Sequence, residues 1–431
     1  MDVRRAAAWA AMGMLVLAYA TPGWRTMGYL PGEAEVPAGD RVRLAPPLPP
    51  GLAVRRLDGG PGTIWLAGRP LGRAWRSLGE RALDVRVARP GTYALGVGAW
   101  GLSVRRVRVD VRAPRRLAVG GQSIGLGVRT AGLLVVGRAW PGGAGVGWPF
   151  GPASLGPGDR IVAAEGASVA AESDLRTVVE RAGRAGRAVR LTVVRGGRAR
   201  SLAVRPRFDA ALGRYRLGVV VRDRLTGIGT LSMYDPATGL FAALGHAIQE
   251  GGLGPAVPVA GGSVVAAPIQ GVRRGLFGRP GEKVGSVDAA HPWGCLDGAG
   301  PYGVYGRLRT PAPAAPLLPL ATASEVHTGR AWLRTVVRGQ RVERFAVRIE
   351  RVAWGAAQGR QLVVRVEDPR LLALTGGIVQ GMSGSPIVQD GRIAGVLTHV
   401  LVSDPTRGYG VFAERVWNEA LRDHRRRAKC A

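Results

Sequence analysis

The stretch TGGIVQGMSGSPIVQDGRIAGVLTHVLVSDPTRGYGVFAE, residues 375–414, decides the fold of this 431-residue chain. Ser383 lies between two glycines, Gly381 and Gly384, which allow the backbone to bend sharply around the serine hydroxyl. A hydroxyl presented by a tight turn is what a serine nucleophile requires, so Ser383 is the candidate nucleophile. The backbone N–H groups of Gly381 and Ser383 are the candidate oxyanion donors. Ser385 follows the turn and is expected to pack at the start of the next strand.

A serine nucleophile also requires an imidazole that takes its proton. His246 directly follows an apolar strand at residues 240–243, and this chemistry requires a base at the end of a strand. We therefore predict His246 as the general base. His399, on the strand after the nucleophile, could be a packed core histidine. The chain has three other histidines, in segments expected to be loops or in the basic tail: His291, His327 and His424.

The carboxylate that would orient the imidazole is left open among several aspartates. Asp368, in the run Val366-Glu367-Asp368-Pro369, precedes Ser383 and is our candidate. An Asp-Pro pair also commonly starts a turn, which is the alternative interpretation of this residue. Its rivals are Asp235, Asp288 and Asp404.

Upstream of the nucleophile, the pattern divides the chain into four segments. Residues 1–24 carry Arg4 and Arg5 before an apolar run, which predicts a signal peptide or a membrane anchor and therefore export of the rest. Residues 25–115 alternate in short runs, as at 102–111, and predict a small β-rich domain. Residues 116–206 and 207–431 form the third and fourth segments, and Ala413 to Arg427 predicts a C-terminal helix.

Residues 116–206 resemble a PDZ domain. The likeness depends on the run LGPGDRIVAAEG, residues 155–166, and on the helical run SDLRTVVERAG, residues 173–183. The resemblance implies a groove that binds an extended peptide, with a glycine-rich loop taking the terminal carboxylate. By position we expect that loop at Ser123, Ile124, Gly125, Leu126, Gly127 and Val128.

The turn at Ser383 is similar to the nucleophile turn of chymotrypsin-like proteases, and the whole stretch 375–414 looks like the signature of the SpoIVB peptidase family. The family resemblance implies a mainly β chain in which the PDZ domain precedes a trypsin-like β-barrel peptidase. It implies a triad of His246, Asp368 and Ser383. It also implies action between forespore and mother cell, on the peptidase itself and on a membrane-bound regulator of an intramembrane protease, so that a late sigma factor is activated.

Composition excludes several other classes of function. The net charge is +30, but the arginines are spread along the chain without a nucleic-acid-binding motif, so we expect no nucleic-acid partner. Cys295 and Cys430 could form one bridge but no zinc site, and we expect no metal and no organic cofactor. A Ser-Lys dyad would have to use Lys283 or Lys429, and neither has a suitable context. An HtrA-like protease, or a PDZ scaffold without catalysis, are the alternatives.

Overall fold

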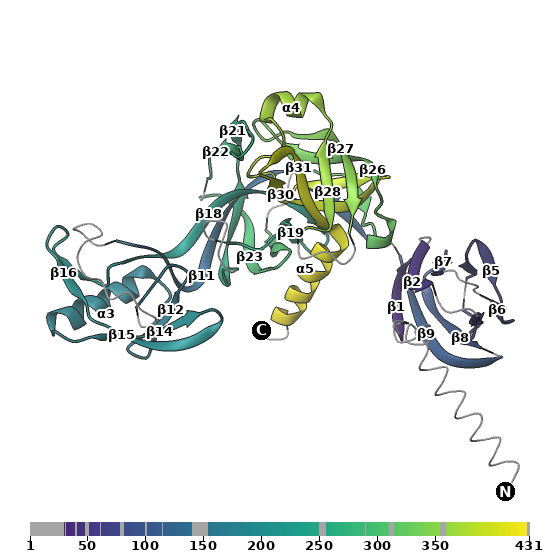
Figure 1. The fold of residues 1–431 in the computed structure, drawn as a ribbon, viewed down its shortest axis with the longest axis horizontal. Helices are drawn as coiled ribbons and strands as arrows, with labels where there is room; N and C mark the ends of the chain where they lie inside the picture. The colour runs from purple at the N-terminus through teal and green to yellow at the C-terminus, as the bar shows by residue number, and fades with distance from the viewer. Residues whose placement is uncertain are drawn as a thin grey trace, which may run out of the picture. The chain divides into compact units, whose positions relative to one another are not determined.

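The computed structural model describes residues 30, 32–38, 41–47, 51–60, 62–77, 82–99, 101–113, 115–139, 154–249, 256–288, 290–309, 314–353 and 359–428 (Figure 1). The predicted export segment, residues 1–24, lies outside these ranges. So does Cys430, so the structure does not test whether it pairs with Cys295. Among the described helices, none is long and apolar enough to cross a membrane. The chain divides into two units, Met1–Arg116 with Pro319–Val326, and Leu117–Leu318 with His327–Ala431.

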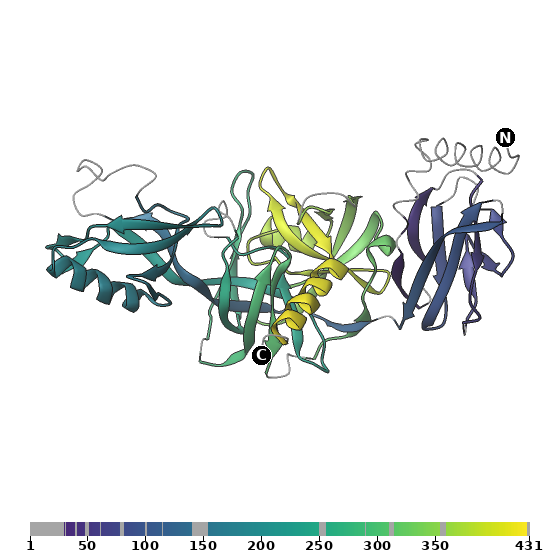
Figure 2. The same ribbon diagram turned by 90° about the horizontal axis from the view of Figure 1, so that it is seen from below.

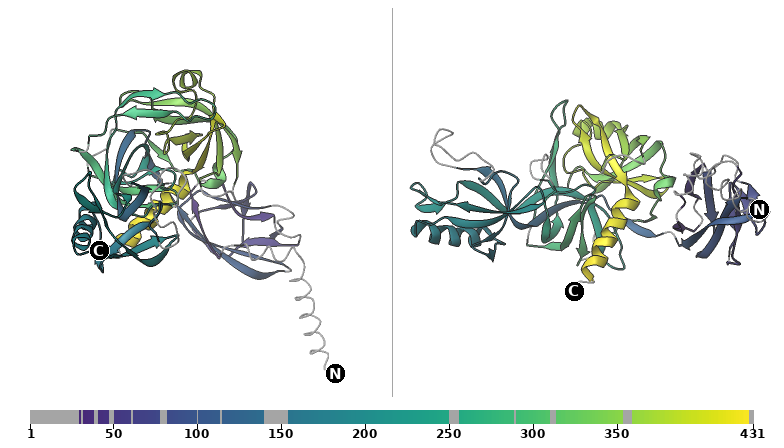
Figure 3. Two further views of the ribbon diagram at one scale, coloured as in Figure 1. Left: turned by 60° about the vertical axis from the view of Figure 1, so that its left-hand side comes forward. Right: turned by 60° about the horizontal axis from the view of Figure 1, so that its bottom comes forward.

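The first unit is a pair of β-sheets that share one apolar core (Figure 3). Alternation in β9 decides which side chains are buried, because Val107, Val109 and Val111 face the core and the charged residues between them, Arg108 and Asp110, do not. The predicted strand at 102–111 is thereby confirmed. One sheet consists of β1 (Glu33–Pro37), β9 (Leu102–Arg112), β8 (Gly91–Ala99), β3 (Ala53–Arg56) and β6 (Arg76–Ser77), and the other of β2 (Arg41–Pro47), β7 (Ala82–Val87), β4 (Ile64–Leu66) and β5 (Arg69–Leu71).

The second unit begins with a small sheet covered by helix α3 (Glu172–Arg184) (Figure 2). The helix buries Leu175, Val179 and Ala182 on one face, as their spacing predicts. Asp159, in the predicted turn before the second strand, is buried and forms an ion pair with Arg195 at 2.6 Å. The strands are β12 (Arg160–Ala164), β13 (Ala167–Ser168), β14 (Val189–Arg195) and β15 (Arg198–Val204), followed by the hairpin β16 (Arg207–Asp209) and β17 (Arg214–Arg216).

Two long antiparallel strands, β11 (Ser123–Arg138) and β18 (Val219–Tyr234), connect this sheet to a barrel (Figure 1). The first half of β11 and the last half of β18 belong to a closed ring of six paired strands. The ring is completed by β20 (Val259–Ala266), β23 (Pro292–Gly300), β24 (Gly303–Leu308) and β19 (Leu240–Leu244). Apolar residues of every one of these strands fill its interior.

A second closed barrel contains the sequence that decided the fold. It is formed by β26 (Gly329–Val336), β27 (Val342–Val352), β28 (Leu362–Val366), β31 (Asp404–Phe412), β30 (Arg392–Leu401) and β29 (Pro386–Gln389). The predicted hairpin at Asp390-Gly391 joins β29 to β30. Helix α4 (Pro369–Thr375) leads into the nucleophile turn, and α5 (Ala413–Ala428), the predicted C-terminal helix, contacts β19, β24 and β30. Two six-stranded barrels are the architecture of a trypsin-like peptidase, so the predicted fold class is confirmed.

The prediction that Ser123–Val128 form a carboxylate-binding loop is wrong, because these residues form a strand. Ser123 to Val128 form the first part of β11 and pair with β18 on one edge and with β20 on the other. The glycines of this run serve close packing, since a Cβ at Gly125 would lie 2.7 Å from Val287. A strand paired on both edges leaves no backbone donors for a ligand carboxylate.

Candidate active site

Ser383 lies in a turn that the structure holds from both barrels. Gly381 and Gly384 have φ angles of +90° and +98°, which a side chain would strain. Thr230 of β18 donates its N–H to the Ser383 carbonyl at 2.9 Å and its hydroxyl to the Gly381 carbonyl at 2.8 Å. A Cβ at Gly384 would lie 2.1 Å from the Thr230 carbonyl oxygen, so glycine is required for this close approach.

The N–H groups of the turn fall into two sets. Those of Met382, Gly384 and Ser385 donate to backbone carbonyls of Val379, Leu397 and Met382, respectively. Those of Gly381 and Ser383, the two predicted oxyanion donors, donate no hydrogen bond to any described residue. Two adjacent unpaired donors beside a nucleophile are what an oxyanion hole provides.

The Ser383 hydroxyl donates to the Thr398 carbonyl at 2.6 Å. No hydrogen bond joins it to His246 within the part of the chain described. The nucleophile and the predicted base nevertheless line the same cavity, and catalytic hydrogen bonds often tighten only when substrate binds.

His246 comes directly after β19, where the sequence predicts the base. Its Nδ1 lies 2.8 Å from the carbonyl oxygen of Ala247, which orients the ring through the backbone. Burial lowers the pKa of His246 below its ordinary value of 6.5. A neutral imidazole is the form that accepts a proton from serine.

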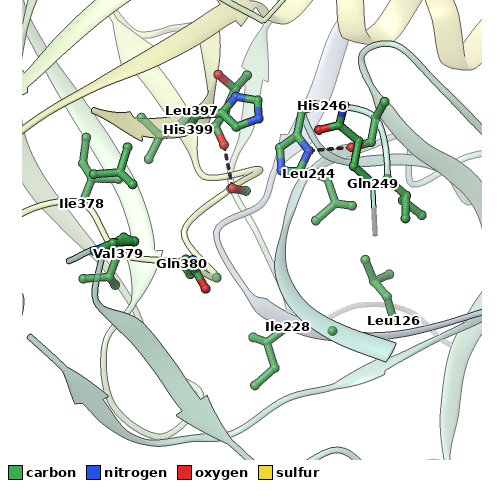
Figure 4. Close-up of a pocket in the computed structure, with 18 of the residues that line it drawn as sticks. Leu126, Ile228, Leu244, His246, Gln249, Ile378, Val379, Gln380, Leu397 and His399 are labelled. Carbon is green, nitrogen blue, oxygen red and sulfur yellow. Dashed lines mark hydrogen bonds between the residues drawn. The ribbon is translucent and has the colours of Figure 1, made fainter. Parts of the chain in front are cut away.

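His399 is a second histidine of the site, which the sequence interpretation placed in the core. Its ring centroid lies 4.5 Å from that of His246, and Figure 4 shows the two rings side by side. Desolvation, together with the neighbouring His246 and Arg360, lowers the pKa of His399 to about 4. His399 lines the cavity beside His246 and is not enclosed in the core of the barrel, so its interpretation as a core histidine is wrong.

The cavity has a volume of about 590 Å³ and is lined by both barrels (Figure 4). The first barrel contributes Leu126, Ile228 and Leu244, and the second contributes Ile378 and Leu397, among others. Apolar walls around a nucleophile and a base favour a ligand with at least one apolar group.

Asp368 does not join this site. It is the N-cap of α4: one carboxylate oxygen accepts the N–H groups of Arg370 and Leu371, and the other accepts that of Ala346 at 3.2 Å. No hydrogen bond or ion pair between Asp368 and His246 occurs among the described residues. The alternative interpretation, an Asp-Pro pair that starts a local element, describes what the structure shows.

The rival aspartates are also engaged elsewhere. Asp235 accepts from Ala237 and Thr238 in its own turn, Asp288 pairs with the exposed His291, and Asp404 accepts from Thr406. The part of the chain that the structure describes therefore brings together Ser383, His246 and the oxyanion donors, without a carboxylate behind His246.

The unpaired edge of the PDZ-like sheet lies elsewhere than the predicted loop. Over Val219–Val221, β18 pairs with β11 on one edge, and no described strand pairs with its other edge. Val219 and Val221, together with Val178 of α3, pack partly exposed against the core beneath the helix. Gly218, at φ +72°, directly precedes this edge.

Sequence reasoning missed this edge, and it missed His399 and Lys283. Alternation could not have placed His399, because the pairing of β30 is irregular between Leu397 and His399 and four consecutive residues, 397–400, line the cavity. Lys283, one of two lysines in the chain, is buried behind the turn. Within the described ranges, no group of three His, Cys, Asp or Glu side chains is arranged to hold a metal ion.

Comparison with known proteins agrees with this architecture. Residues 213–417 match the family model described as SpoIVB peptidase S55, and residues 146–205 match the model of a PDZ domain. No curated protein matches the chain. The first match contains His246, Ser383 and both barrels apart from the start of β11, and the second contains α3. The chain therefore contains a serine peptidase domain of the SpoIVB S55 family, preceded by a PDZ domain.

Proposed function

We propose that this peptidase is an exported regulatory endopeptidase of sporulation that acts between forespore and mother cell. It cleaves itself near its N-terminus, and it cleaves a membrane-bound regulator of an intramembrane protease so that a late sigma factor is activated. The observation that carries catalysis is the shared cavity of Ser383 and His246, with two unpaired N–H donors in the nucleophile turn. The apolar run behind Arg4 and Arg5 supports export.

The test of catalysis is self-cleavage of the full chain. Purified chain and its Ser383→Ala variant are incubated and compared by intact-mass spectrometry. We expect N-terminal truncation in the first and none in the second. Ser201→Ala is the matched control, because Ser201 is an exposed serine of β15 that does not line the cavity. Truncation that persists in the Ser383→Ala variant would show that another protease makes the cut.

The test of the regulatory role is complementation in sporulating cells that lack their own SpoIVB-type peptidase. We expect the intact chain to restore activity of the late sigma factor and the Ser383→Ala variant to fail. A PDZ scaffold without catalysis is the alternative. It predicts that both chains restore sigma-factor activity equally.

A further inference from the structure

Lys283 of the hairpin β21 (Ile269–Arg273) and β22 (Glu282–Gly285) is buried directly behind the nucleophile turn. Only 5% of its surface is exposed. In the described part of the chain its ammonium group contacts two hydroxyls, Ser123 Oγ at 3.1 Å and Thr335 Oγ1 at 2.8 Å, and forms no ion pair. Burying a lysine ammonium without a carboxylate partner costs folding free energy. A function that requires Lys283 at this position would therefore explain its burial.

The backbone of Lys283 fixes the direction of one oxyanion donor. The Lys283 N–H donates to the Gln380 carbonyl at 2.9 Å. In a trans peptide the carbonyl and the following N–H point in opposite directions. Since the Gln380 carbonyl is directed at Lys283, the N–H of Gly381 is directed away from it, where Gly381 and Ser383 line the cavity.

The side chain of Lys283 supports the same peptide. A Cβ at Gly381 would lie 3.1–3.3 Å from Cβ, Cδ and Cγ of Lys283, so the aliphatic stem packs directly beneath Gly381. The stem is held in place at its far end by the hydroxyls of Ser123 and Thr335. Three different strands are thereby connected to the turn through one side chain.

A series of hydrogen-bonded side-chain hydroxyls extends from Lys283 to the other side of the nucleophile turn. Ser385 Oγ lies 3.1 Å from Thr335 Oγ1 and 3.4 Å from Thr230 Oγ1, and Thr230 donates to the Gly381 carbonyl. The side chains of Thr230, Thr335 and Ser385 are fully buried. Both peptide groups that flank Gly381 are therefore held, one by the Lys283 backbone and one by Thr230.

We propose that Lys283 is a positioning residue of the peptidase, which aims the Gly381 N–H at the oxyanion. This proposal rests on the proposed catalysis by Ser383. The ammonium group does not contact substrate. It anchors the stem against which the oxyanion turn is built.

The test is the rate at which a fluorophosphonate probe labels Ser383, because the phosphoryl oxygen of the probe occupies the oxyanion hole during attack. Lys283→Met keeps the backbone hydrogen bond and most of the stem but removes the ammonium group. Misplacing one catalytic donor costs up to about 10²-fold, so we expect the rate constant to fall by roughly 10- to 100-fold. Saturation with a fluorogenic peptide substrate should show a similar fall in kcat, with KM changed less than about threefold.

Matched variants separate positioning from folding. Arg273→Met alters an exposed charge of the same hairpin and should leave labelling unchanged. Thr335→Ser keeps the hydroxyl that binds the ammonium and should be labelled at nearly the wild-type rate. Thr335→Val removes that hydroxyl and should be labelled more slowly than wild type. The folded fraction of each variant is measured by thermal melting in the same buffer.

The outcomes are distinct. If wild-type Ser383 is not labelled at all, both the proposed catalysis and this inference fail. If wild type and Lys283→Met are labelled at equal rates, the positioning role alone is wrong. A fall in labelling that matches the loss of folded protein would likewise overturn it, because Lys283 would then be only a structural residue.

Discussion

At the scale of single residues, the state of the Ser383 hydroxyl is the main question. It donates to the Thr398 carbonyl, whereas attack on a peptide requires that it donate to His246. Because the hydroxyl is bonded to a backbone carbonyl and not to the base, we infer that the described arrangement is a resting state of the nucleophile.

The first prediction concerns pH. His246 must be neutral to accept the serine proton, and burial lowers its pKa below the ordinary value of 6.5. Labelling of Ser383 by a fluorophosphonate should therefore stay constant from pH 8 to about 6.5 and fall only at lower pH. The measurement is the labelling rate across pH 4 to 8, and an inflection above about 7 would contradict it.

His399 provides the control for this profile. Its pKa is about 4, so it is uncharged over most of the range measured. Replacing it in His399→Gln should leave the position of the acid limb unchanged, even where the rate itself changes through altered packing on His246. If His399→Gln shifts the pH at which the labelling rate falls, the titration belongs to His246 and His399 as a coupled pair and not to His246 alone.

The second prediction concerns stability at Lys283. Burial lowers its pKa from 10.5 to about 7, so between those values the unfolded chain binds more protons than the folded one. Stability contributed by this residue therefore rises with pH from about 7 to 10.5 and is lost as pH falls towards 7. The groups that face the ammonium are hydroxyls of β11 and β26, while the adjacent Glu282 pairs with Arg273 on the exposed side.

Lys283→Met should therefore be more stable than wild type at pH 7 by roughly 1–3 kcal/mol, because it no longer buries an ammonium. The difference should shrink as pH rises towards 10. Urea denaturation at pH 7 and pH 9.5 measures it. A variant that is less stable than wild type at both values would contradict the prediction. Greater stability combined with slower labelling is the pattern expected of a functional residue.

At the scale of elements, strands and helices with regular spacing could be predicted from sequence. The alternation of β9, the apolar face of α3 and the turn Asp390-Gly391 each depend on local pattern, and all are present. The first part of β11 could not be predicted, because Ser123–Val128 contains glycines that indicate a loop by local rules. Tertiary pairing with β18 and β20 on both edges decides its conformation instead.

The same limit applies to the site. Ser383 and His246 could be predicted because each has a local signal, a glycine-flanked turn and a strand end. Asp368 could not be assigned in this way, since the Asp-Pro pair satisfies a local role completely. His399 and Lys283 are remote from each other in sequence, and only the folding of two barrels brings them to the turn.

The third prediction tests the role of Asp368 on α4. Asparagine is nearly as good an N-cap as aspartate, so Asp368→Asn should change stability by less than about 1 kcal/mol and leave labelling of Ser383 nearly unchanged. A triad carboxylate behaves differently, because its change to the amide lowers the rate by about 10⁴-fold. Thermal melting and fluorophosphonate labelling of the same sample distinguish the two. A collapse of labelling without unfolding would restore Asp368 to the triad.

At the scale of the whole second unit, β18 connects the two functional regions. Its first residues, Val219–Val221, lie beside α3 with one unpaired edge. Residues 226–228 line the catalytic cavity, and Thr230 donates to the Ser383 carbonyl from the edge that faces away from β11. PDZ domains bind peptides by adding a strand to such an edge.

The last prediction follows from this continuity. If the carboxylate of a substrate is bound near Gly218, its upstream residues extend along β18 towards Ser383. The strand from Val219 to Thr230 spans roughly 36 Å at about 3.3 Å per residue, which an extended peptide covers with about ten residues. We therefore expect preferred cleavage about ten residues before a free C-terminus.

Peptides of one sequence with a free, an amidated or an extended C-terminus measure this directly, and amidation should lower kcat/KM by roughly tenfold. Val178→Glu places a charge beside the groove of α3, at a side chain outside the catalytic cavity. It should abolish the difference between free and amidated peptides while leaving fluorophosphonate labelling of Ser383 intact. Equal cleavage of all three peptides by wild type would show that the groove and the active site bind their ligands independently.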